Sequence, residues 1–120
     1  MPEPVALTRR FDAPDERRDF PLGRFELVQI GGMTVGRAEY EPGWRWSEHV
    51  GASTGRAVCE VAHLGFVVSG RNLIEMTDGR VIEVGPGDLF EIGPGHDSSV
   101  IGDEPYVSIH FLGADQYGAR

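Results

Sequence analysis

The residues of this chain best suited to chemistry are its four histidines, His49, His63, His96 and His110, and its single cysteine, Cys59. Neutral imidazole and thiolate are ligands that zinc, iron, copper and nickel accept in proteins. The histidines lie in separate segments of the chain, so no short motif assembles them. Only a fold that brings distant segments together would give them a common centre.

Other reaction classes are disfavoured by residue type. All eleven basic residues are arginines, so Schiff-base chemistry and Walker-type phosphate binding through a lysine are excluded. Ser98 and Ser99 follow His96 and Asp97, but neighbouring residues of a strand point to opposite faces, and no G-x-S-x-G elbow is present. A Ser-His-Asp triad is therefore not expected.

Size and charge narrow the class of protein. A chain of 120 residues, 40% hydrophobic and 25% charged, is expected to form one globular domain. Its formal charge of −8 argues against nucleic acid and anionic membrane as partners. One cysteine excludes an intrachain disulfide and fits a reducing compartment. Neither a transmembrane-length apolar run nor a signal peptide is found, so we expect a cytoplasmic protein.

The glycines predict many short strands joined by tight turns. Seventeen glycines are roughly twice the ordinary share, and they fall between short apolar runs. Residues 41–55 are interpreted as a long loop with a short strand around 46–49, and a bulge is expected at Gly65. Eight strands with such turns indicate an all-β protein, a closed or double-sheet barrel. The main strands are expected at residues 24–30, 33–40, 58–69, 72–77, 80–84, 88–92, 98–101 and 105–112.

Residues 1–22 differ from the rest, because they mix charges of both signs with four prolines. We interpret them as an N-terminal arm with one helical turn at 14–18, followed by a barrel domain over 23–120. The arm either packs along a sheet edge, or reaches a neighbouring subunit, or is a loosely attached terminus.

Two glycine-rich stretches match parts of a two-part motif. In the first part, G-x5-H-x-H followed by E-x6-G, Gly43 precedes His49 by six positions and Gly51 stands where the second histidine belongs. His63, seven residues before Gly70, occupies the place of the glutamate.

In the second part, G-x5-P-x-G-x2-H, Gly87 begins the match, Ser98 takes the histidine position, and His96 stands two residues earlier. Through these stretches residues 42–113 resemble the cupin superfamily, small jelly-roll barrels that often hold one metal ion between two sheets. The resemblance implies a cupin-type jelly-roll β-barrel (double-stranded β-helix).

The resemblance also implies a metal centre formed by His49, His63 and His96. Cys59 has the same strand parity as His63, but four residues of regular strand separate their Cα atoms by about 13 Å, so Cys59 would join the centre only if the strand bends. We expect one divalent transition metal, zinc first, with iron, nickel, manganese and copper as alternatives.

Each candidate ligand has a purely structural alternative. His63 could be a hydrogen-bonded core residue, His49 a surface loop residue, His96 a turn residue, and Cys59 a small buried hydrophobe. His110 faces either solvent or the cavity.

A pocket beside the metal is expected to include Trp46, Ser98 and His110. The function predicted is that of a small metalloenzyme acting on a small organic molecule in the barrel cavity. The alternative is a non-catalytic module that binds or senses a small molecule or a metal. We also expect a homodimer, because small cupins commonly pair through sheet edges.

Overall fold

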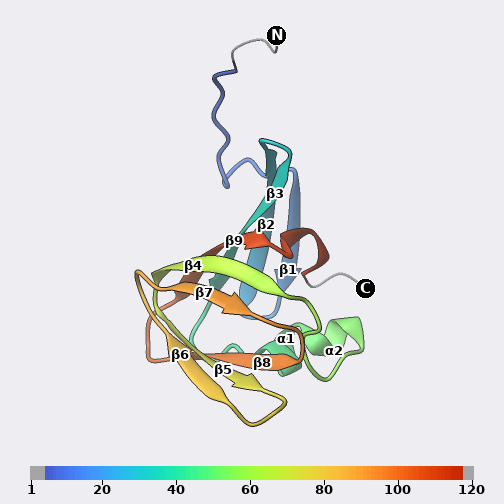
Figure 1. Ribbon diagram of the computed structural model, residues 1–120, viewed down its shortest axis with the longest axis vertical. Coiled ribbons are helices and arrows are strands. Elements are labelled where there is room, and N and C mark those ends of the chain that lie inside the picture. Colours follow the sequence, from blue (N-terminus) through green and yellow to red (C-terminus); the bar gives the residue numbers. More distant parts are fainter. Residues whose placement is uncertain (1–4, 118–120) are drawn as a thin grey trace.

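The chain forms two antiparallel β-sheets, which a computed structural model describes for residues 5–117 (Figure 1). The larger sheet has six strands in the order β1–β2–β3–β9–β4–β7, and the smaller has three in the order β6–β5–β8. The strands are β1 (Glu16–Phe20), β2 (Gly23–Ile30), β3 (Met33–Tyr40), β4 (His63–Ser69), β5 (Arg71–Met76), β6 (Val81–Val84), β7 (Leu89–Ile92), β8 (His96–Ile101) and β9 (Tyr106–Leu112). The described residues also form three short helices, α1 (Trp46–His49), α2 (Gly51–Thr54) and the 3-10 helix η1 (Ala114–Gln116).

The period-two pattern and the glycine turns predicted most of these strands. Gly31 and Gly32 join β2 to β3 with φ angles of 60° and 74°, a region that favours glycine. Gly79, with φ 95°, does the same between β5 and β6. The expected bulge at Gly65 is confirmed, because the pairing of β4 with β9 changes register between Leu64 and Gly65. The all-β, two-sheet prediction is therefore confirmed, whereas closure into a jelly-roll barrel stays a prediction.

The helical turn expected at 14–18 is wrong, because this segment enters strand β1. β1 pairs antiparallel with β2, from Glu16 opposite Leu27 to Phe20 opposite Gly23, and it covers the edge of the larger sheet. Its charged side chains suit an edge strand that faces water. Residues 1–4 of the expected arm and residues 118–120 of the expected barrel lie outside the described residues.

The short strand expected around 46–49 is also wrong, because residues 46–54 form α1 and α2. The Val50 N–H donates to the Trp46 carbonyl at 2.9 Å, and both side chains are buried. Residues four apart lie on one face of a helix, so a single turn buries both side chains. In a strand the same two residues would share their face with Glu48, which is exposed in the structure.

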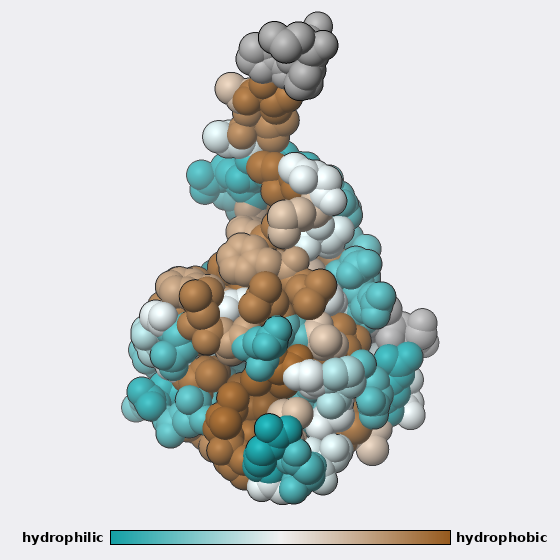
Figure 2. Space-filling view, in the orientation of Figure 1, coloured by the Kyte–Doolittle hydropathy of each residue, from teal (hydrophilic) through white to brown (hydrophobic). Residues whose placement is uncertain are grey.

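The core lies between the sheets and is formed by alternate residues of their strands, including Phe25, Ala38, Val67, Ile74 and Val100. Outside it, apolar side chains remain exposed on the face that carries β4 and β7 and along the projecting N-terminal segment (Figures 1 and 2). Within residues 5–117, no helix has the length and apolarity to cross a membrane. The expected homodimer and cytoplasmic location stay predictions.

Gly65 offers a test of the bulge, because a Cβ there would lie 2.5 Å from the Ile109 carbonyl oxygen and 2.6 Å from Cζ of Phe90. We expect Gly65→Ala to lower the free energy of unfolding by about 1–3 kcal/mol, as overpacking does. Gly93→Ala is the matched control, since a Cβ at Gly93 meets nothing within 4 Å. Urea unfolding measures both, and equal stability of the two variants would contradict the tight packing at Gly65.

Candidate metal centre

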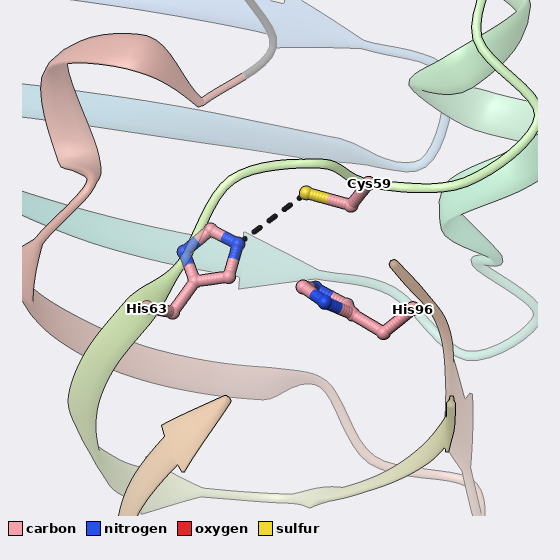
Figure 3. A group of neighbouring side chains, drawn as sticks. All are labelled: Cys59, His63 and His96. Carbon is pink, nitrogen blue, oxygen red and sulfur yellow. Dashed lines mark hydrogen bonds between the residues drawn. The ribbon is translucent and has the colours of Figure 1, made fainter. Parts of the chain in front are cut away.

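Three buried side chains converge between the sheets: Cys59, His63 and His96 (Figure 3). One ligand atom from each lies within 4.8 Å of the other two, and Cys59 Sγ is 3.4 Å from His63 Nε2. A tetrahedral zinc ion with bonds of about 2.3 Å to sulfur and about 2.05 Å to nitrogen would place these two atoms about 3.6 Å apart. The sulfur and the nitrogen therefore already stand near the separation that zinc requires.

Backbone pairing brings Cys59 and His96 together. The Cys59 N–H donates to the His96 carbonyl at 2.7 Å, and the His96 N–H donates to the Cys59 carbonyl at 3.2 Å, which makes an antiparallel bridge. The Gly95 N–H also donates to the Cys59 carbonyl, at 2.8 Å. Residues directly opposite in an antiparallel pair project their side chains to the same face. The thiol and the imidazole therefore share one side of the bridge.

His63 joins them because the chain bends before β4. β4 begins only at His63, and residues 60–62 form no strand, so Cys59 and His63 do not belong to one regular strand (Figure 3). This is the bend that the sequence required for Cys59 to take part. It turns a spacing that is too long in a straight strand into the contact of 3.4 Å.

The ring of His96 is oriented by its own turn. Nδ1 lies 2.8 Å from the Gly93 carbonyl oxygen, so Nδ1–H donates to that oxygen and the lone pair is left on Nε2. Metal-binding histidines commonly donate their other ring N–H to a backbone carbonyl in this way. His96 is therefore held in the tautomer that a metal ion needs.

Burial sets the protonation of the site. It lowers the pKa of His63 to about 2, with smaller contributions from His110 and His96, and it lowers the pKa of His110 to about 4. Burial also raises the pKa of the Cys59 thiol to about 11. Without a metal ion the site at neutral pH is therefore an uncharged thiol among neutral imidazoles, and a cation that binds there would replace the thiol proton.

A cavity of about 40 Å³ adjoins His63 and His96. It is lined by Tyr40, Trp46, His63, Asn72, Ile74, Phe90, Ile92, His96, Ser98, Tyr106, His110 and Tyr117. This list includes the three residues that were predicted to lie beside the metal, Trp46, Ser98 and His110. His110 lies inside rather than facing solvent; its Nε2 is 2.9 Å from Ser108 Oγ, and its ring centre is 5.2 Å from that of His63.

The structure does not bring His49 into the group of ligand atoms. His49 ends α1, where its Nδ1 accepts a hydrogen bond from the Arg45 backbone N–H at 2.9 Å, and its side chain is half-buried. The motif spacing from Gly43 had selected His49, and a short strand had been expected at 46–49. Because a helical turn replaces that strand, the ring caps its own helix, and Cys59 stands in the group instead.

Sequence reasoning did not single out the tyrosines and the asparagine of the cavity. Tyr40 and Asn72 lie at inward positions of β3 and β5, so the period-two pattern could have found them. Tyr117 follows the last helical turn and is nevertheless buried, with its ring centre 5.4 Å from that of His63. Because Tyr117 lies outside any strand or helix, no periodic pattern in the sequence indicates that it is buried.

Comparison with solved structures shows a cupin-like fold. The chain is similar to a cupin-like protein from Thermotoga maritima, with 16% identity and a TM-score of 0.54 over 78% of this chain and 70% of that one. It is also similar to a protein of unknown function from Acidithiobacillus ferrooxidans, with 18% identity and a TM-score of 0.58 over 81% and 86% of the two chains.

A capsular polysaccharide assembling protein from Staphylococcus aureus matches with 20% identity and a TM-score of 0.57, over 86% of this chain and 29% of that one. No family model and no curated protein matches the chain. At these identities the likeness shows the fold, which agrees with the resemblance of the sequence motifs to cupins.

The buried histidines predict a stability that falls in mild acid. Below about pH 6.5, His63 and His110 are protonated in the unfolded chain but stay neutral in the folded protein, because burial lowers their pKa values. Lowering the pH therefore favours the unfolded state. Each histidine contributes a slope of about 1.4 kcal/mol per pH unit, His110 down to about pH 4 and His63 down to about pH 2. Urea unfolding of metal-free protein between pH 7 and pH 5 measures the slope. His110→Gln, which cannot titrate here, should lose one histidine's share, and identical slopes would contradict the burial of a neutral His110.

Proposed function

We propose that this cupin-like chain is a small metal-binding protein in which Cys59, His63 and His96 bind one divalent transition metal ion inside a jelly-roll barrel. The observation that carries the proposal is the convergence of three buried ligand atoms from three segments of the chain. Within this group His63 Nδ1 is buried without a hydrogen-bond partner, and such an atom costs about 1–3 kcal/mol, which packing alone does not repay.

Zinc suits this ligand set best. Thiolate and imidazole together are typical zinc ligands, and the separation of 3.4 Å between Cys59 Sγ and His63 Nε2 is close to a tetrahedral edge. In the described part of the chain the group contains no carboxylate, which a two-histidine, one-carboxylate iron site would require. Iron, nickel, manganese and copper remain the alternatives to be compared in a binding experiment.

Three protein ligands support a metalloenzyme, because catalytic zinc sites keep a fourth position open for water or substrate. The cavity beside His63 and His96 gives that position a place for a small molecule. A bound ion would act there as a Lewis acid and would lower the pKa of bound water. The protein's own contribution is to orient His96 through the Gly93 carbonyl and to keep the imidazoles neutral.

A non-catalytic metal or ligand sensor is the second candidate. The volume of about 40 Å³ has room for only a few water molecules, which leaves little space for an organic substrate to rearrange. A turnover assay with metal-loaded protein separates the candidates once a ligand is known, because a sensor binds that ligand without consuming it.

Metal binding is tested by loading stripped, tag-free protein with cobalt(II), which replaces zinc and reports its ligands by absorption. Cys59→Ser should abolish the thiolate-to-cobalt charge-transfer band. His63→Ala and His96→Ala should weaken metal affinity by more than the roughly 100-fold that loss of an outer-shell partner costs.

His49→Ala is the matched control, because His49 lies outside the ligand group. It should bind cobalt as the parent protein does. Loss of the band in His49→Ala, or its persistence in Cys59→Ser, would overturn this ligand assignment, and elemental analysis showing no metal uptake by the parent protein would overturn the proposal.

A further inference from the structure

Unpartnered polar atoms gather around the cavity. Within residues 5–117, seven buried side-chain nitrogen or oxygen atoms have no hydrogen-bond partner, and five of them belong to cavity residues. These five are Tyr40 Oη, Trp46 Nε1, His63 Nδ1, Asn72 Oδ1 and His110 Nδ1. Each unsatisfied buried group costs about 1–3 kcal/mol, so their gathering in one place indicates a bound molecule that satisfies several of them.

The unpartnered atoms are of two kinds. The Trp46 indole N–H can only donate, so it requires an acceptor on the ligand, whereas the Tyr40 hydroxyl can donate or accept. Asn72 Oδ1 can only accept, so it favours a donor on the ligand. Trp46 comes from α1 and Asn72 from β5, and both side chains are 3% exposed. A ligand that carries an acceptor and a donor on different atoms would satisfy both groups at once.

Charge restricts the ligand further. Among residues 5–117, no arginine, aspartate or glutamate lines the cavity, and the sequence contains no lysine. A divalent ion held by one thiolate and two neutral imidazoles carries a net charge of +1. A buried single charge is stabilised by one opposite charge, whereas a dianion would leave a second charge without a partner. The volume of about 40 Å³ limits the monoanion to a few atoms.

We propose that the metal-loaded cavity binds a small hydroxy-monocarboxylate, of which glycolate is the smallest. This inference rests on the proposed function, since the metal ion supplies the positive charge. The carboxylate occupies the open position of the metal and accepts from Trp46 and Tyr40, and the hydroxyl group donates to Asn72 Oδ1. Binding is non-covalent, and the inference concerns which molecule is held, not its conversion.

The test titrates cobalt-loaded protein with glycolate, acetate, the neutral glycolamide and the dianion malonate, followed by calorimetry and by the cobalt spectrum. Glycolate should bind most tightly, about tenfold better than acetate, which lacks the hydroxyl group. Glycolamide and malonate should bind at least that much more weakly than glycolate. Equal affinity for glycolate and glycolamide, or no spectral response to glycolate, would overturn the inference.

Two matched tryptophan variants locate the ligand. Trp46→Phe removes an N–H that lines the cavity, and Trp44→Phe removes one that is equally buried and unpartnered but lies outside the cavity. We expect about tenfold weaker glycolate binding in Trp46→Phe and unchanged binding in Trp44→Phe. Equal effects in the two variants would contradict the assignment.

Asn72→Leu, of similar volume, should reduce the preference for glycolate over acetate, and an unchanged preference would contradict the role of Asn72. The ligand series on the parent protein needs no variant to fold. A cobalt band without a carboxylate response refutes this inference alone, whereas the absence of the cobalt band refutes the proposed function and this inference with it.

Discussion

The antiparallel bridge between Cys59 and His96 is the contact on which the site depends. It joins the segment before β4, in the larger sheet, to the start of β8, in the smaller sheet, through backbone hydrogen bonds of 2.7 and 3.2 Å. Because opposed residues of an antiparallel pair share a face, the bridge by itself places the thiol next to the imidazole. The same hydrogen bonds satisfy backbone groups that would otherwise be buried without partners. This one pairing thus links the two sheets and places two of the three candidate ligands side by side.

The strand period supplies the rest of the site. Inward positions of β4 and β9 carry His63 and His110, and Gly65 stands opposite His110 in the register of these strands. A glycine at that position leaves the space into which the Phe90 ring enters, and Phe90 in turn packs edge-on against His110 at 5.5 Å. The bulge at Gly65 therefore helps to form the cavity wall. Because Phe90 packs against both Gly65 and His110, the packing of this wall also determines where the His110 imidazole lies.

The sequence predicted those features that depend on residues near one another in the chain. Glycine turns and alternating apolar residues located β2, β3, β5 and β6. The motif's glutamate position selected His63, and His96 was chosen because it stands two residues before the motif's histidine position. The sequence did not predict elements whose structure is determined by contacts with residues far away in the chain. α1 has only four residues, too few to be stable alone, and it forms because Trp46 and Val50 find buried positions in the core. β1 has charged side chains without an apolar face, so only its pairing with β2 makes it a strand.

The exchange of His49 for Cys59 in the ligand group changes the electrostatics as well as the membership. Three histidines around a divalent ion would leave a net charge of +2 in a cavity without acidic side chains, and two negative charges would be needed to balance it. With a thiolate ligand the net charge falls to +1, so one negative charge is enough to balance it. A bound ion would displace the thiol proton, and the sulfur would keep a negative charge. The raised pKa of Cys59 means that the thiol holds its proton in the metal-free protein, so the empty site carries no buried charge that would destabilise it. Cysteine at this position is therefore compatible both with a stable metal-free fold and with the proposed cation site.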